Sequence, residues 1–162
     1  MERYSSIVFY CGSEDVEGLV QTSLNMGILV TEKDKVSMSY CVRSSVDREK
    51  RALIDSLESY MTNIGGEFSV SGDYPGWEYK KESPLRDLMV ELYSKQYGEA
   101  PVIEAIHAGV ECGIFAGKIP ELDCVSYGPN LSEIHTCRER MSISSVQRVY
   151  KMTREIIIHG IK

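Results

Sequence analysis

The sequence of 162 residues lacks features that would tie it to a membrane or to nucleic acid. Its longest apolar runs, such as residues 156–158, are far too short to span a membrane. No basic stripe accompanies the net charge of −6, so we expect neither a nucleic acid nor a membrane as partner. The N-terminal stretch MERYSSIVFYCGSED lacks the apolar core of a signal peptide, which predicts a cytoplasmic location.

Paired cysteines are missing as well. The five cysteines are odd in number and form no CxxC motif, so neither a disulfide framework nor a zinc ribbon is expected. We predict reduced, mostly buried thiols instead. The remaining composition, 43% hydrophobic and 26% charged, is ordinary for a globular protein, and the length suits one domain or two small subdomains.

The first half of the chain changes its hydrophobic period once. Residues 36–42 alternate between apolar and polar, which indicates a half-buried strand, and residues 19–34 predict one or two strands before it. From Asp47 to about Ile64 the spacing is helical, with Asp47 as the expected N-cap and a Gly-Gly pair as the end. Residues 67–77 predict a further strand. This ββαβ order is typical of an α+β sandwich.

The second half alternates helices with short strands. Ser83 followed by Pro84 favours a helix start, and Gly98 favours its end. The elements expected after it are a strand at 101–108, a helix at 109–120, a strand at 122–128 and a helix at 142–159. Such alternation predicts α/β layering with parallel strands, beginning after a boundary at residue 76. Two short strands make an incomplete sheet, so we expect either a second copy of the chain or a missing part.

His135 is the strongest candidate for a functional residue. It follows a predicted strand end and a Gly-Pro turn, the place where α/β proteins bind ligands. Two interpretations stay open on these local features. The histidine is either a metal ligand or acid/base group, or a histidine of a surface loop.

Other candidates are weaker on local grounds. His107 and Glu111 lie four residues apart at a predicted helix start, which suits an anion site or a simple stabilising pair. Arg43 ends the alternating strand and could clamp a carboxylate or protect a sheet edge. Asn25, close to a glycine, is typical of a turn.

Metal ligands around His135 are scarce. A hydrolytic zinc site needs at least three protein ligands and an open position. The sequence has three histidines, no HxD motif, no adjacent pair of glutamates and no histidine pair at ligand spacing. On local features, the sequence therefore supplies only part of a zinc site.

Four segments, however, carry a specific combination of motifs. They are EGLVQTSLNMGILVTEKDKV, VRSSVD, IEAIHAGVECGIF and VSYGPNLSEIHTCRERMSISSVQRVY. Together they resemble the Xaa-His dipeptidases, also called aminoacyl-histidine dipeptidases or peptidase D, within the zinc-dependent aminoacylase and carboxypeptidase family. The resemblance runs from about Asp15 onward, and HAGxECG followed by GPN…H…ER is its most specific part.

The resemblance implies an α+β and α/β fold in two portions. The family has a catalytic domain with a site for two zinc ions, interrupted by an inserted lid domain. Residues 1–76 would be the second half of the lid, a domain of the dimerisation type. Residues 77–162 would be the C-terminal part of the catalytic domain. The partners implied are a dipeptide substrate and either a missing N-terminal half or a second copy in a homodimer.

The resemblance also assigns roles to single residues. His135 matches the last zinc ligand of the family, and Arg43 matches a lid arginine near the substrate carboxylate. Asn25, His107 and Glu111 match positions near the substrate. The other zinc ligands and the general base have no counterpart in this chain, so the isolated chain is predicted to be inactive. The alternative is a non-catalytic, self-associating interaction module.

Overall fold

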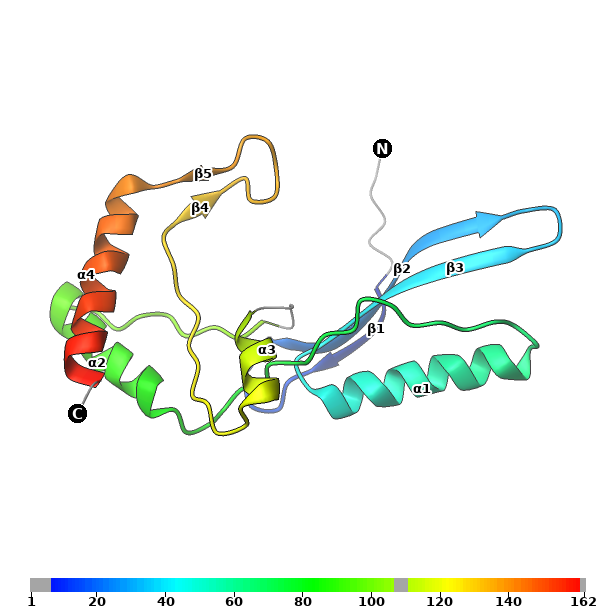
Figure 1. Cartoon of the computed structure of the whole chain (residues 1–162), viewed down its shortest axis with the longest axis horizontal. Coiled ribbons are helices and arrows are strands. Elements are labelled where there is room, and N and C mark those ends of the chain that lie inside the picture. Colours follow the sequence, from blue (N-terminus) through cyan, green and yellow to red (C-terminus); the bar gives the residue numbers. More distant parts are fainter. Residues whose placement is uncertain (1–6, 107–110, 161–162) are drawn as a thin grey trace. The chain divides into compact units, whose positions relative to one another are not determined.

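The computed structural model of the chain describes residues 7–106 and 111–160 (Figure 1). The elements in order are β1 (Ile7–Gly12), β2 (Val20–Thr31), β3 (Val36–Ser44), α1 (Asp47–Asn63), α2 (Pro84–Tyr97), α3 (Glu111–Lys118), β4 (Leu131–Ser132), β5 (Arg140–Met141) and α4 (Ile143–Gly160). The chain divides into two compact units. The first comprises Met1–Lys81 with Glu104–Glu121, and the second Glu82–Ile103 with Leu122–Lys162. The predicted mixed α/β class is confirmed.

The first unit is built on a three-stranded antiparallel sheet in the order β1-β2-β3. The predicted hairpin is confirmed, with Glu32 N–H donating to the Lys35 carbonyl at 2.7 Å in the turn. The sequence did not predict β1, whose described residues pair with β2 as far as Asn25. Beyond that point β2 and β3 pair with each other, and some of their apolar side chains there, such as Ile28 and Val36, are exposed.

Helix α1 follows β3 directly and packs beside it (Figure 1). The predicted N-cap is wrong by one residue: Val46 occupies that position without a side-chain cap, and Asp47 is already helical. The reason is that the Asp47 carboxylate is used elsewhere, accepting a hydrogen bond from Gly76 N–H at 2.8 Å. The predicted end is confirmed, because Gly65 is left-handed (φ 75°) and Gly66 N–H returns to the Met61 carbonyl at 2.8 Å.

An ion cluster ties the segment after α1 back to the start of that helix. Lys50 is only 6% exposed, and its ammonium lies 2.8 Å from Asp73 and 3.1 Å from Asp47. It also donates to the Tyr74 carbonyl. Burial lowers the pKa of Lys50, but the hydrogen bonds to the two carboxylates outweigh it and raise the pKa. The hydrogen bond from Lys50 lowers the pKa of Asp73. We call Asp47, Lys50, Asp73 and Tyr74 the clasp.

The clasp explains why one predicted strand is absent. Residues 67–77 form no strand: the Tyr74 carbonyl and the Gly76 N–H bond to side chains of α1 and not to a neighbouring strand. The chain is packed tightly there: a Cβ on Gly76 would lie 2.4 Å from the Ser45 carbonyl oxygen. The same segment also packs against α3 at Gly113 and Gly117. A Cβ added to either glycine would lie within 3.3 Å of an atom of Pro75.

The second unit pairs two helices. Ser83 caps α2 by accepting from Arg86 N–H at 3.2 Å, and left-handed Gly98 ends the helix, as predicted. Asp123 reinforces this start, accepting from the Ser83 hydroxyl at 2.7 Å and from Leu85 N–H at 2.8 Å. Helices α2 and α4 lie side by side (Figure 1).

The parallel strands predicted for the second half are wrong within the described residues. Residues 101–106 and 122–128 have no regular structure, and residues 107 and 108 lie outside the described part. The only ladder described there is the two-residue antiparallel pair β4–β5. A strand exists only where a neighbour completes its hydrogen bonds, and these segments find none among residues 7–106 and 111–160.

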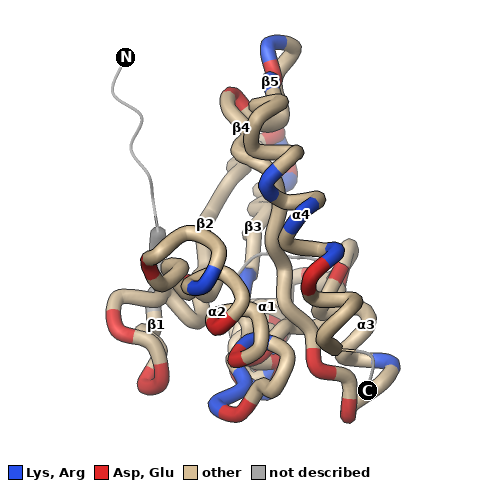
Figure 2. The backbone as a smooth tube through the Cα atoms, turned by 90° about the vertical axis from the view of Figure 1, so that its left-hand side faces the viewer, with Lys and Arg blue, Asp and Glu red and all other residues tan. Residues whose placement is uncertain are grey.

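The core is thin for a chain of this length. Among the described residues, the buried apolar side chains are Leu24, Val46, Ile54, Leu92 and Met152. Many large apolar side chains are exposed, including Ile143 and Tyr150 on α4. Charged residues of both signs are interspersed along the backbone (Figure 2). No helix in the described ranges is long and apolar enough to cross a membrane.

Candidate functional site

His135 lies on a loop between β4 and β5, residues 133–139, which we call the His-loop. The two short strands bring its ends together, pairing Ser132 with Arg140. Below them, Ser142 N–H donates to the Asn130 carbonyl at 3.0 Å, and Asn130 N–H donates to the Ser145 hydroxyl at 2.9 Å. The base of the His-loop is thereby fixed to the start of α4.

The backbone of His135 adopts an unusual conformation. Its φ is 64°, and that of Glu133 is 53°. Residues other than glycine rarely enter this left-handed region because their Cβ approaches the carbonyl oxygen. The side chain of His135 is exposed, and its backbone N–H donates to the Glu139 carboxylate at 2.8 Å. The loop thus presents an accessible imidazole on a constrained backbone.

Charged side chains close the His-loop from within. The two oxygens of Glu133 each accept from a guanidinium, Arg138 at 2.8 Å and Arg140 at 2.5 Å. Thr136 turns the chain, with its hydroxyl donating to the Glu133 carbonyl at 2.7 Å. Glu133 and Glu139 were not predicted from the sequence, although the charge cluster around His135 was the available signal.

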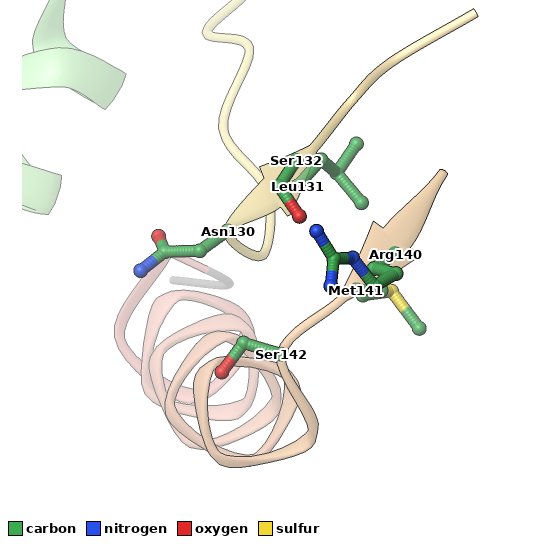
Figure 3. A pocket seen from close by; sticks show the side chains of 6 residues that line it. All are labelled: Asn130, Leu131, Ser132, Arg140, Met141 and Ser142. Carbon is green, nitrogen blue, oxygen red and sulfur yellow. The ribbon is translucent and has the colours of Figure 1, made fainter. Parts of the chain in front are cut away.

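An open groove lies beside the loop base (Figure 3). It is lined by Asn130, Leu131, Ser132, Arg140, Met141 and Ser142, with a volume of about 330 Å³. Figure 3 shows the Arg140 guanidinium near the Ser132 hydroxyl, between β4 and β5. Because His135 does not line this groove, the groove is not centred on the candidate ligand.

Asn25 and Arg43 share one face of the sheet in the first unit. Asn25 lies opposite Cys41, and Arg43 is two residues further along β3, so the two side chains are diagonal neighbours. The other face, with Thr22, points to α1, since the Thr22 hydroxyl donates to Glu49 at 2.5 Å. Asn25 is half-buried and Arg43 is exposed. Asn25 is a strand residue, so its local interpretation as a turn residue is wrong.

Glu111 and His107 are the remaining candidates. Glu111 is exposed at the first residue of α3, and His107 lies outside the described residues. Asn25, Arg43 and Glu111 belong to the first unit, and His135 to the second. All five cysteines carry reduced thiols, but three are half-buried and Cys41 and Cys137 are exposed, so the prediction of mostly buried thiols is wrong.

The described side chains alone do not make up a zinc site. Within residues 7–106 and 111–160, no three or more His, Cys, Asp or Glu side chains gather in a way that could hold a metal ion. A catalytic zinc requires three protein ligands, and the His-loop supplies one imidazole.

Comparison with known proteins identifies the class of protein to which this fold corresponds. The chain is 34% identical over 145 residues to the cytosol non-specific dipeptidase of Escherichia coli (strain K12), a match that covers 90% of this chain and 30% of that protein. The crystal structure of aminoacylhistidine dipeptidase from Vibrio alginolyticus matches with a TM-score of 0.83 and 34% identity. That match covers 94% of this chain and 31% of the other. No protein-family model matches the chain.

Both relatives are dipeptidases, and the chain spans about a third of their length. The resemblance to Xaa-His dipeptidases that the motifs indicated is confirmed, and it extends to the fold. The mixed α/β arrangement described above matches part of that dipeptidase structure.

Proposed function

We propose that this chain is one part of a zinc-dependent dipeptidase that hydrolyses Xaa-His dipeptides in the cytoplasm. The observation that carries the proposal is the structural match to an aminoacylhistidine dipeptidase, with a TM-score of 0.83 over 94% of the chain. In this proposal residues 1–76 belong to the lid and residues 77–162 to the catalytic domain. The name of the Escherichia coli relative, a cytosol enzyme, supports the location.

His135 would be one zinc ligand in the assembled enzyme. Its exposed imidazole, on a loop with a fixed base, suits that role. When bound, zinc would provide the chemistry of an activated water and of a polarised scissile carbonyl. Because the described residues do not complete a metal site, the remaining ligands would come from polypeptide that corresponds to the rest of the relatives' length.

Arg43 and Asn25 would hold the substrate. A guanidinium binds a carboxylate through two parallel hydrogen bonds, and a neighbouring amide can donate a further one. The shared sheet face of the two residues supports this assignment. Glu111, at the start of α3, and His107 would lie near the same substrate.

Zinc titration of the isolated chain tests the ligand assignment. We expect weak binding without stoichiometric zinc, because a single imidazole cannot hold the ion tightly. Hydrolysis of Xaa-His dipeptides should be absent. Activity of the isolated chain that is lost on chelation and in His135→Ala would contradict the idea that it is only part of an enzyme.

Co-expression tests the function itself. The chain would be produced together with the portion of the Escherichia coli dipeptidase that lies outside the matched region. We expect zinc-dependent hydrolysis that His135→Ala abolishes. Arg43→Ala should weaken it mainly by raising KM. Arg43→Lys is the matched control, because it keeps the positive charge but lacks the two parallel hydrogen bonds of a guanidinium. Equal kcat/KM for alanyl-histidine and alanyl-leucine would remove the Xaa-His specificity from the proposal.

A further inference from the structure

The left-handed backbone of His135 requires a compensating interaction. Placing a residue with a Cβ in this region costs about 1–2 kcal/mol. In the His-loop both His135 and Glu133 are placed there. Such conformations persist only where surrounding contacts fix them, and they concentrate at functional sites. A specific contact is therefore expected to hold the His135 backbone in place.

The interaction at His135 is a hydrogen bond to Glu139, a residue that is itself held by the loop. The backbone N–H of His135 donates to the Glu139 side chain at 2.8 Å. Glu139 in turn is anchored by its own N–H, which donates to the Thr136 carbonyl at 3.2 Å. A hydrogen bond to an ionised acceptor is stronger than one between neutral groups. The carboxylate of Glu139 thus acts directly on the peptide group that precedes the His135 Cα.

The Glu133 ion pairs contribute differently. Arg138 and Arg140 are 79% and 71% exposed, and exposed ion pairs stabilise by less than about 1 kcal/mol. They connect the two sides of the loop but do not contact the backbone of His135. Of the two acidic side chains in the His-loop, Glu139 is the one whose loss would release that backbone.

We propose that Glu139 is a positioning residue: its carboxylate holds the His135 backbone in the left-handed conformation and so sets the direction in which the imidazole leaves the loop. The consequence for metal binding rests on the proposed function of His135. The role of Glu139 in the backbone geometry is independent of that function. A ligand must be held within about 0.5 Å and 10–20° of its working geometry, which an exposed loop achieves only with such support.

The first test measures the geometry in the full chain without metal. In ¹⁵N-labelled protein, the His135 amide should exchange with solvent about tenfold more slowly than an unprotected amide, as expected for a hydrogen bond to a charged acceptor. Glu139→Ala should abolish this protection and shift the φ-dependent coupling of His135 to the value for negative φ. Glu139→Gln keeps an oxygen acceptor and should retain most of the protection.

A matched control separates this effect from loss of charge. Glu91→Ala removes an exposed carboxylate that pairs with Lys95 on α2, in the same unit, and should leave the His135 amide unchanged. An unprotected His135 amide in the parent chain, or the same exchange rate and coupling in Glu139→Ala, would overturn the proposal.

The second test reads the consequence in the co-expressed enzyme. Zinc affinity should fall about 10–100-fold in Glu139→Ala, the usual effect of losing support behind a ligand, and Glu139→Gln should restore most of it. If the amide result holds but His135 proves not to bind zinc, the proposed function fails while the positioning role stands. Unchanged zinc affinity in a variant that has lost the amide protection would refute the link between positioning and metal binding.

Discussion

The clasp and the His-loop use the same chemistry at two levels of burial. Each joins two short segments through carboxylates, basic side chains and backbone groups. In the clasp the central ammonium of Lys50 is 6% exposed, whereas Arg138 and Arg140 of the His-loop are 79% and 71% exposed. Burial raises both the strength of an ion pair and the cost of breaking it. We therefore expect disruption of the clasp to destabilise the fold, and disruption of the His-loop network to change overall stability little.

The largest expected effect is that of Lys50→Met. The substitution leaves Asp47, Asp73 and the Tyr74 carbonyl without their shared donor, and we expect a loss of about 3 kcal/mol in the free energy of unfolding. Urea unfolding followed by circular dichroism measures it. Arg51→Ala is the matched control, because Arg51 contacts the same Asp73 at 2.7 Å but is 60% exposed. We expect about 0.5 kcal/mol for that variant, and equal losses would invalidate the role of burial.

Gly76→Ala should have the next largest effect. Its new Cβ would lie 2.4 Å from the Ser45 carbonyl oxygen, and because that atom belongs to the backbone, relief requires the segment to move away from the connection between β3 and α1. We expect a loss of about 2 kcal/mol, comparable with overpacking of a core. Gly128→Ala, where no atom lies within 4 Å of the added Cβ, should change stability by less than about 0.5 kcal/mol. A tolerated Gly76→Ala would show that the segment is not held as described.

The clasp also predicts how stability depends on pH. The pKa of Asp73 is lowered from its usual 3.8, so its contribution is present above that pH and is lost as pH falls through the lowered value. The pKa of Lys50 is raised from 10.5, so its contribution is present below pH 10.5 and is lost as pH rises through the raised value. The midpoint of urea unfolding, measured from acid to alkaline pH, tests this dependence. Asp73→Asn should remove about 1 kcal/mol of the acid-side dependence, and an unchanged profile would contradict the clasp.

The smallest effect is expected in the His-loop. Glu133→Ala removes both ion pairs with Arg138 and Arg140, yet the free energy of unfolding should change by less than about 1 kcal/mol because all three side chains reach solvent. The same urea experiment measures it. A loss as large as that of Lys50→Met would remove the distinction between the two networks.

Elements with local signals were predicted well. The helices α1, α2, α3 and α4 and the β2–β3 hairpin all follow from periodicity and from caps such as Ser83 and Gly98. The strands expected at 67–77, 101–108 and 122–128 were not found in the described residues, and β1 was missed. Alternating or apolar sequence indicates a segment able to be a strand, but only a neighbouring backbone makes it one.

The candidate site divides in the same way. The motif around His135 indicated a dipeptidase, and the comparisons confirm that resemblance. The pattern did not reveal that His135 is left-handed or that Glu139 binds its amide, since both depend on how the loop closes. Whether His135 binds zinc, and whether Arg43 and Asn25 bind substrate, stay predictions.

The sequence by itself determined the helices, the caps of α2, the hairpin and the resemblance, because these depend on residues a few positions apart. Only the tertiary structure decided the use of Asp47 for Gly76 in place of capping, the burial of Lys50, and the register that places Asn25 beside Arg43. Each of these joins segments distant in the chain. The partner that satisfies a buried charge or a backbone donor is chosen by proximity in space, which no local pattern encodes.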